Sequence, residues 1–295
     1  MAEVHQFTYG AFNPLAAYLL AFLGSVLGLL STGRARVAPS RGRRTRWLLI
    51  GALAIGDAIW LTHFAAMLGF DVPESPVRYD IPMTALSLGS AVVAVGIGLL
   101  IVGHGPRSFP KTVGAGLFAG GGIFAMHYTG MAAVSVSGEI HYRMNLVVAS
   151  AVIAVTAATA ALWFAVSVRG WGRLSGAATL MAAAVCGMHY TSMAAVSVHL
   201  EPVSPGGVTG LRPLTMIVPI VVLTATTIVG AAFFALQAMT EEEFTDGAGT
   251  PRRGVHAVPH HPWSLRQASL SAARRTTTGP RPTPRPVPMR SSSGN

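Results

Sequence analysis

The chain has 295 residues, of which 51% are hydrophobic and 11% are charged. A soluble domain usually has about a quarter of its residues charged, so the composition excludes an ordinary soluble protein and predicts an integral membrane protein. The net charge of +10 does not indicate nucleic-acid binding, because the arginines lie beside apolar runs or in the C-terminal tail, where the anionic headgroups of membrane lipids attract them. The single cysteine, Cys186, excludes an intrachain disulfide.

Seven apolar runs follow one another along the chain, each near the roughly 20 residues that a helix needs to cross a bilayer. The runs are continuous rather than alternating, which indicates helices and not the strands of a membrane barrel. We therefore predict an all-α fold, an integral membrane bundle of seven transmembrane helices in a multi-pass protein of the cell membrane. The runs cover 14–32, 47–70, 84–102, 113–136, 145–168, 174–198 and 215–239.

The distribution of arginine and lysine predicts the orientation of the bundle. Loops 33–46, 103–112 and 169–173 together hold ten of these cations, whereas the loops on the other side hold three. Positively charged loops stay in the cytoplasm, so we expect the N-terminus outside and the C-terminus inside. The first run is too long for a signal-peptide core and no basic residue precedes it, so no cleaved signal is expected.

The C-terminal tail, 240–295, differs from the rest of the chain. It is rich in Pro, Arg, Ser and Thr and poor in apolar residues, a composition that favours a disordered cytoplasmic tail over a catalytic output domain. The sequence contains no paired intramembrane carboxylates, no nucleophile with an adjacent base and no phosphate-binding loop. We therefore expect that the chain is not an enzyme.

A short signature occurs three times, as "IWLTHFAAM" at 59–67, "FAMHYTGM" at 124–131 and "CGMHYTSM" at 186–193. Its histidines, His63, His127 and His189, are 64 and 62 residues apart, a period of two membrane helices. The repeat predicts one N-terminal helix followed by three helical hairpins. In each hairpin the first helix carries the histidine, and 215–239 closes the last hairpin as the seventh helix.

The three signature helices run in the same direction, so their histidines are expected at one depth near the outer face. A histidine against hydrocarbon is costly and normally faces the bundle interior. We expect the three histidines to converge on a shared site. The alternative is a membrane scaffold in which each histidine packs separately and hydrogen-bonds to a neighbouring helix.

Each histidine is followed four residues later by a methionine, which places the pair on one helix face. Imidazole and soft thioether ligands suit Cu(I), while Cu(II) or Zn(II) is served by imidazole alone. Cys186 is a further possible ligand, although Trp60 and Phe124 at the matching positions favour a filling role. The predicted metal ligands are His63, Met67, Met126, His127, Met131, Met188, His189 and Met193.

Other cofactors and functions stay open at this point. Haem held by two of the histidines is the alternative to copper. A copper-handling permease would need ligands on both sides of the membrane, whereas these cluster on one side. A retinal protein would need a lysine in a late helix, but the chain's lysine is Lys111, in a loop.

Two further features lie inside the apolar runs. Asp57 precedes His63 by six residues, about 240° around the helix and 9 Å along it, so the two side chains are not expected to share a ligand shell. Asp57 is instead expected to pair with a polar group in the bundle or to be held neutral by burial. Gly116 and Gly120 have the small-residue spacing that allows close helix packing, which we expect to hold His127 in position.

Three Met-His-Tyr-Thr signatures in alternate helices resemble those of the MHYT-domain family of bacterial membrane sensors. The resemblance covers about 12–201 plus the closing helix and implies copper near the outer membrane face and a sensed gas such as oxygen, carbon monoxide or nitric oxide. Related proteins often continue into cyclic-dinucleotide signalling domains, so a separate cytoplasmic signalling protein is the expected partner. The first copy departs from the pattern at Thr62 and Phe64. The motif residues that would orient the imidazoles are Phe64, Tyr128, Thr129, Tyr190 and Thr191.

Overall fold

The computed structural model describes residues 2–200, 208–230 and 233 of the chain. These residues confirm the predicted all-α class, and each of the first six predicted runs overlaps one long helix. The predicted tail, 240–295, lies outside the described residues, and the predicted closing helix is described as an α-helix from 217 to 230 after the short turn η1 (Pro213–Met216). The long helices are α1 (Phe12–Val37), α2 (Arg41–Met67), α3 (Ile81–Gly103), α4 (Phe109–Ala132), α5 (Met144–Ser167) and α6 (Trp171–Met193).

Local sequence signals set where several helices begin. The Ser40 hydroxyl accepts a hydrogen bond from the Arg43 amide at 3.3 Å before α2, and the Asp80 carboxylate accepts one from the Met83 amide at 2.8 Å before α3. Such side chains satisfy amides that have no partner within the helix. A proline stands in the first turn of both α3 and α4, where its missing amide costs nothing.

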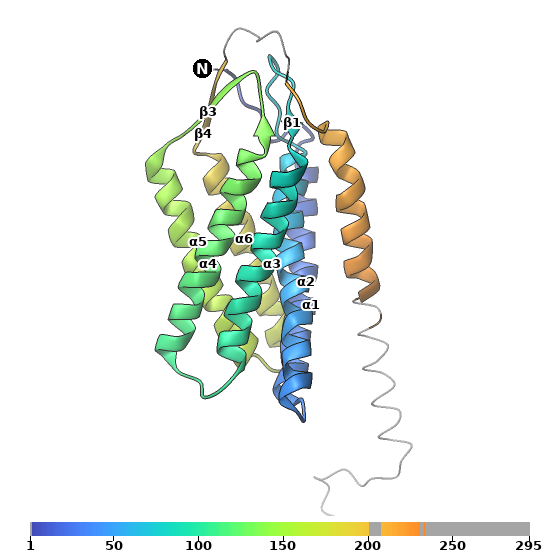
Figure 1. Ribbon diagram of the computed structural model, residues 1–295, viewed down its shortest axis with the longest axis vertical. Coiled ribbons are helices and arrows are strands. Elements are labelled where there is room, and N and C mark those ends of the chain that lie inside the picture. The colour runs from blue at the N-terminus through green and yellow to red at the C-terminus, as the bar shows by residue number, and fades with distance from the viewer. Residues whose placement is uncertain (1, 201–207, 231–232, 234–295) are drawn as a thin grey trace, which may run out of the picture. The chain divides into compact units, whose positions relative to one another are not determined.

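The six long helices form a closed ring in chain order (Figure 1). Each packs against the next, and α6 packs back against α1. The signature helices α2, α4 and α6 thus take alternate places, and all three approach one another at the centre. The helix 217–230 stands outside this ring, beside α2 and α3.

The helix α1 packs between α6 and α2 and thereby closes the ring. Glycines in α1 explain this close packing. A Cβ atom on Gly24 would collide with Ala58 of α2, and one on Gly28 would collide with Ile55. Small residues of this kind let two membrane helices approach closely.

Five helical segments are long and apolar enough to cross a membrane: α1, α2, α3, α5 and Pro213–Gly230. The helix α4 contains six glycines, and α4 and α6 each carry the polar His-Tyr-Thr sequence, which lowers their mean hydropathy. With 24 and 23 residues they are as long as their neighbours. The total of seven spans and the orientation of the chain stay predictions.

The two ends of the ring differ in structure. At the end where α2, α4 and α6 finish, β1 (Arg78–Tyr79) pairs with β2 (Val134–Ser135), and β3 (Gly138–Tyr142) pairs with β4 (Val196–Leu200). Both pairs are antiparallel. The N-terminal segment is tied to this end through hydrogen bonds of Ala2 with Val198 and of His5 with Asp71.

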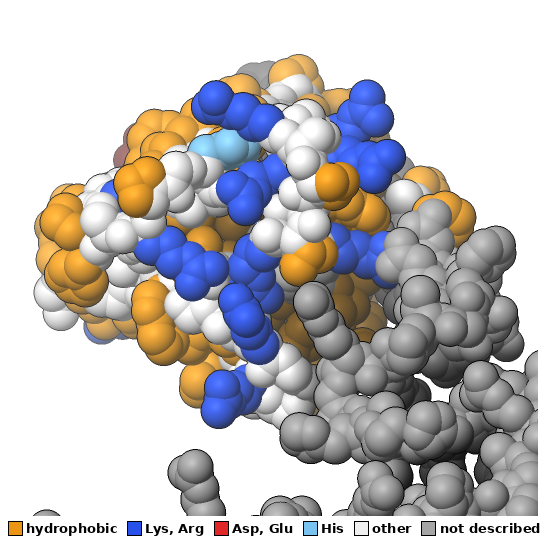
Figure 2. Space-filling view, turned by 90° about the horizontal axis from the view of Figure 1, so that it is seen from below, with side chains coloured by type: hydrophobic (Ala, Val, Ile, Leu, Met, Phe, Trp, Pro, Cys, Tyr) orange, Lys and Arg blue, Asp and Glu red, His pale blue; other side chains and the backbone are white. Residues whose placement is uncertain are grey.

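The opposite end carries short loops and a concentration of arginine side chains (Figure 2). Several of these cations cap helix ends. Arg36 donates to the carbonyls of Ala165 and Val168 at the end of α5, and the Lys111 ammonium donates to the His104 carbonyl after α3. Cations at helix C-termini are favourable because they pair with the unsatisfied carbonyls and with the helix dipole.

The glycines of α4 provide a test of the packing that carries His127. A Cβ atom on Gly120 would lie 2.5 Å from Val155 Cα of α5, whereas one on Gly121 would meet no atom within 4 Å. We expect Gly120→Ala to lower the free energy of unfolding by about 1–3 kcal/mol through overpacking. Gly121→Ala is the matched control and should be neutral or slightly stabilising. Thermal unfolding of the detergent-purified variants measures both, and equal melting temperatures would contradict the packing role.

Candidate metal centre

Three histidines from alternate helices meet at the centre of the ring. His63, His127 and His189 each lie within the last turn and a half of α2, α4 and α6, and each is at most 2% exposed. The ring centroids are 4.8, 5.1 and 5.2 Å apart, and each pair of rings is nearly perpendicular. One nitrogen atom per ring lies within 4.8 Å of the corresponding atoms of the other two. The structure thus brings the three histidines together at one depth, as the repeat predicts.

Three of the six ring nitrogen atoms in this triad are buried without a hydrogen-bond partner among the described residues. His63 Nδ1 and His189 Nδ1 are 3.2 Å apart, a hydrogen bond in which one ring donates and the other accepts. Within the part of the chain that the structure describes, His63 Nε2 and both ring nitrogens of His127 are buried without a partner. Each unpaired buried polar atom costs about 1–3 kcal/mol. Separate packing of the histidines against neighbouring helices leaves this cost unexplained.

The donor set fits a metal ion. A tetrahedral or trigonal site with metal–nitrogen bonds of about 2.0–2.1 Å places its nitrogens about 3.5 Å apart. One nitrogen of each ring already lies within 4.8 Å of those of the other two, so small rotations of the rings would bring them to this spacing. Neutral imidazole suits copper and zinc among the common metals. The unpaired nitrogens would then serve as ligands.

Three layers of side chains follow one another along the axis of the ring. The histidine layer is preceded, one helical turn earlier, by Ile59, Ile123 and Val185, and these line an apolar cavity of about 60 Å³ together with residues from all six helices. One turn after the histidines lie Met67, Met131 and Met193, each at most 2% exposed. Long side chains on a helix lean toward its N-terminus, which directs these methionines back toward the histidine layer.

The other predicted ligands take different positions. Met126 is buried in α4, while Met188 lines the apolar cavity and its sulfur accepts a hydrogen bond from Ser192 at 3.6 Å. Cys186 is a free, half-buried thiol, and among the described residues the clustered ligand atoms come from the three histidines without it. These three residues therefore stand at the edge of the centre.

Aromatic rings surround the imidazoles. Phe64, Tyr128 and Tyr190 each contact the ring of the preceding histidine at centroid distances of 4.7, 5.0 and 5.0 Å. Tyr128 also contacts Tyr142 of β3 at 5.4 Å, and burial followed by the neighbouring Tyr128 raises the pKa of Tyr142 to about 12. The rings of Phe64, Tyr128 and Tyr190 thus enclose the imidazoles with aromatic contacts.

The motif threonines lie near the ends of their helices, and their predicted role in orienting the imidazoles stays a prediction. The Thr191 hydroxyl donates to the Gly187 carbonyl at 2.7 Å, so its own helix satisfies it. Thr129 is half-buried near the end of α4. In the first copy, the Thr62 hydroxyl likewise donates to the Ala58 carbonyl at 2.7 Å.

Sequence reasoning missed the role of Gly130, which makes room for the triad. A Cβ atom at Gly130 would lie 2.6 Å from His63 Nε2, so the imidazole of α2 rests against the backbone of α4. The matching positions in the other copies are Ala66 and Ser192. A small residue three positions after every histidine is the signal that could have indicated this contact.

The N-terminal segment is a second feature that sequence reasoning missed. The Gln6 amide donates to the Met193 carbonyl at 2.8 Å, and the Thr8 hydroxyl donates to the Gly69 carbonyl at 2.9 Å. Phe7 stacks on Tyr190 with centroids 5.5 Å apart. The segment thus binds the ends of α2 and α6 next to the histidine layer.

Asp57 is separate from the triad, as its spacing predicts. Its Oδ2 accepts a hydrogen bond from the Thr227 hydroxyl at 2.8 Å, which ties α2 to the helix 217–230. The predicted pairing with a polar group in the bundle is thus confirmed, with a partner 170 residues away. The pair lines a cavity of about 350 Å³ that also includes Leu223 and residues of α1 and α3.

Comparison with known proteins agrees with this architecture. The MHYT family, described as "Bacterial signalling protein N terminal repeat", matches residues 56–115 and 120–177. The matched segments contain His63 and His127, and the third copy around His189 follows them. No solved structure matches the chain.

Curated bacterial signalling proteins are similar over much of the chain. The bifunctional diguanylate cyclase/cyclic di-GMP phosphodiesterase MucR of Pseudomonas aeruginosa is 34% identical over 252 residues, which cover 82% of this chain and 36% of the relative. The cyclic di-GMP phosphodiesterase NbdA of the same organism is 35% identical over 67% of this chain and 26% of the relative. The signaling protein YkoW of Bacillus subtilis is 27% identical over 69% of this chain and 26% of the relative. The chain thus spans about a third or less of these relatives.

The fold and the repeated signature define a membrane sensor domain of the kind found in bacterial signalling proteins. The chain belongs to the MHYT family. The activities in the names of the relatives belong to those longer proteins.

The contact between Gly130 and His63 gives a test that leaves every predicted ligand in place. We expect Gly130→Ala to push the His63 ring away from the other two, because the added methyl group would lie 2.6 Å from Nε2. Metal bound by the triad should then fall to less than half of the wild-type content, as measured by mass spectrometry of the purified protein. Gly187→Ala is the control, since a Cβ there meets no atom within 4 Å. Equal metal content in wild type and Gly130→Ala would contradict this geometry.

The pair of Asp57 and Thr227 is expected to stabilise the fold without contributing to the metal centre. Thr227→Val removes the donor and leaves a buried carboxylate oxygen unpaired, which should lower the free energy of unfolding by about 1–3 kcal/mol. Thr227→Ser keeps the hydroxyl and serves as the control. Thermal unfolding measures the loss, and metal content should stay at the wild-type value in both variants. Loss of metal in Thr227→Val would instead link Asp57 to the centre.

Proposed function

We propose that the chain is a membrane sensor whose input site is the triad of His63, His127 and His189, which binds one metal ion, with copper as the preferred metal. The observation that carries the proposal is the convergence of three buried imidazoles with partnerless nitrogens from three repeats of one signature. A soft thioether layer of Met67, Met131 and Met193 one turn further on favours Cu(I) over Zn(II). The metal would supply a coordination position for a small ligand. The protein residues would fix the depth of the metal in the bundle and exclude water from it.

The proposed sensed ligand is a diatomic gas such as oxygen, carbon monoxide or nitric oxide. Support comes from the apolar cavity of about 60 Å³ one turn below the triad, whose lining includes Ile59, Ile123 and Val185. Small apolar cavities in proteins stay dry and accept apolar atoms and molecules. The cavity is far smaller than the several hundred Å³ that a ligand the size of haem requires, which favours a bare ion over haem.

The proposed output is a separate signalling protein on the cytoplasmic side. The names of relatives that share this domain include signalling activities, and this supports a signalling protein as the partner of the chain. The three histidine-bearing helices begin at the arginine-rich end of the ring (Figure 2). The positive-inside bias assigns this end to the cytoplasm, where its arginines would also contact anionic lipid headgroups. A change in spacing at the triad would be carried along α2, α4 and α6 to that end.

Copper content tests the proposal first. Tag-free protein loaded with Cu(I) in the presence of a competing chelator should retain about one copper per chain, and His127→Ala should retain less than a tenth of that, because a trigonal site loses a ligand. His104→Ala is the control, since His104 bonds to Thr45 and the Leu100 carbonyl at the other end of the ring. Mass spectrometry gives the metal content, and an infrared spectrum of the reduced protein under carbon monoxide tests whether a gas binds.

Two results would overturn the proposal. Wild-type protein that retains no copper after loading would leave the triad as a packing cluster. Copper retained in full by a variant with all three histidines changed to alanine would place the metal elsewhere. Copper that binds without any carbon monoxide band would support the metal centre and reject the gas.

A further inference from the structure

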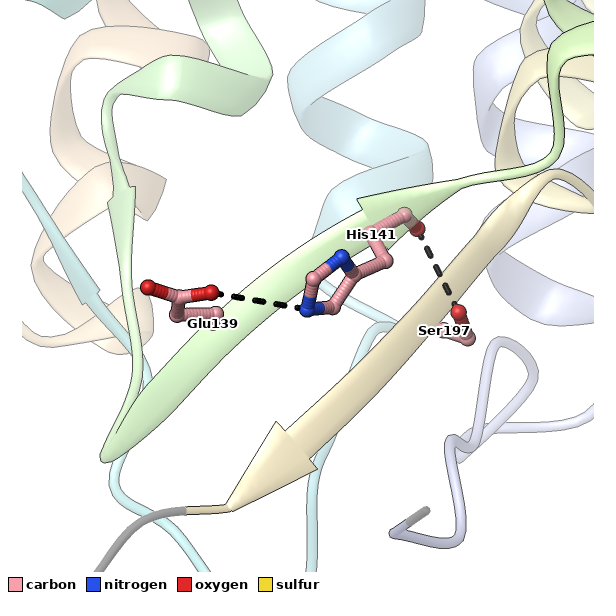
Figure 3. A network of polar contacts seen from close by, with 3 residues as sticks. All are labelled: Glu139, His141 and Ser197. Carbon is pink, nitrogen blue, oxygen red and sulfur yellow. Dashed lines mark hydrogen bonds and ion pairs between the residues drawn. The ribbon is translucent and has the colours of Figure 1, made fainter.

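Two histidines and a glutamate, residue types that can bind metals, lie outside the ring on the ribbon formed by β3 and β4. Glu139 and His199 are directly opposite each other in the antiparallel register, and His141 follows Glu139 by two residues. Side chains two apart on a strand share one face, so all three project from the same side of the ribbon. Figure 3 shows the His141 imidazole directed along the ribbon toward the Glu139 carboxylate.

The His141 side chain lies near both of the other side chains, and all three are exposed. His141 Nε2 is 3.5 Å from Glu139 Oε2, with side chains 52% and 69% exposed. The His141 and His199 rings are 4.7 Å apart by centroid and nearly perpendicular. Their exposure leaves the rotamers free to turn toward a common point, while the register fixes the spacing of the backbone.

The opposite face of the ribbon is anchored to the protein. Val198 is fully buried, and Ile140 and Tyr142 pack against the core. The Arg143 amide donates to the Ala195 carbonyl at 2.9 Å, and the Ala2 amide donates to the Val198 carbonyl at 2.8 Å. The exposed face is therefore a rigid platform, which is what a preformed metal site requires.

An ordinary surface ion pair does not account for this arrangement. An exposed pair of histidine and glutamate contributes about 0–1 kcal/mol to stability, and such a pair involves a single imidazole. A second imidazole in ring contact with the first adds a nitrogen ligand from the neighbouring strand. Two imidazoles and one carboxylate form a donor set that binds zinc and other borderline divalent cations and leaves a coordination position for water.

We propose that Glu139, His141 and His199 form a second metal site, which binds a borderline divalent cation such as Zn(II) or Cu(II). The site is distinct in chemistry from the buried triad, because it is exposed and has a hard carboxylate in place of methionine. A cation bound there links β3, which leads into α5, to β4, which follows α6. The ribbon also reaches the triad through contacts of Tyr142 with Tyr128 and of Tyr128 with His127.

A zinc titration of the full-length protein tests the proposal. The tail contains three further histidines, His256, His260 and His261, so the titration uses tag-free protein in which these three are changed to glutamine. With the buried triad first loaded with Cu(I), isothermal titration with Zn(II) should show one further site, and His141→Gln combined with His199→Gln should raise the dissociation constant of that site at least tenfold. The changed residues are exposed, and an unaltered melting temperature without metal confirms that the variant is folded.

A matched control is available in the N-terminal segment. His5 and Glu3 form a second exposed histidine–glutamate pair, with Nε2 and Oε1 2.9 Å apart, so His5→Gln removes a comparable pair and should leave the dissociation constant unchanged. Equal loss in His5→Gln, or none in the double variant, would overturn the proposal. Electron paramagnetic resonance of the Cu(II)-loaded protein gives an independent result: coupling to two nitrogen nuclei that disappears in the double variant supports the site, and coupling that persists rejects it.

Discussion

The structure depends on the burial of three imidazoles in the interior of a membrane bundle. Polar nitrogen atoms in such surroundings need partners, and lipid cannot supply them. His63, His127 and His189 can reach one another only if their helices alternate around a closed ring and run in the same direction. The order of α1 to α6 meets both conditions.

The repeat of about 63 residues turns one local pattern into layers with approximate threefold character. Methionines, histidines and branched aliphatic residues recur at intervals of four, one helical turn, so that each layer receives one side chain from each of α2, α4 and α6. The copies are unequal where the rings meet. Ala66, Gly130 and Ser192 are all small, but glycine stands where the His63 ring touches the backbone of α4. The contact of the His63 ring with the α4 backbone thus coincides with the smallest residue of the three.

Much of this arrangement follows from the sequence. The run lengths predict the helices, and the spacing of the histidines with a common helix direction predicts their convergence. Gly116 and Gly120 pack against Thr159 and Val155 of α5, as their spacing indicates. These features depend on periodicity within one helix, which a sequence displays directly.

Other features depend on which helices become neighbours, and periodicity does not contain this information. The position of α1 between α6 and α2 follows from the fit of Gly24 and Gly28 against α2, not from any signature. The partner of Asp57 is Thr227, and an isolated hydroxyl in an apolar run gives no sign of such a role. The proximity of His141 and His199 on the exposed face of β3 and β4 could likewise not be predicted from periodicity, because it depends on the pairing register of the two strands.

The position of the triad explains how a local event could affect the far end of the molecule. The histidines lie near the last turn of helices with 23 to 27 residues, so at 1.5 Å per residue about 30 Å of helix separates them from the arginine-rich loops. Each of those loops joins a histidine-bearing helix to a plain one, and Arg36 and Lys111 bind the carbonyls that end α5 and α3. Lys111 lies in α4, and Arg44 of α2 donates to the Ala35 carbonyl near the end of α1. Movement of α4 or α2 along its axis must therefore shift or break these caps. Under the proposed function, the caps are the contacts through which metal or gas at one end changes the surface presented to a partner at the other.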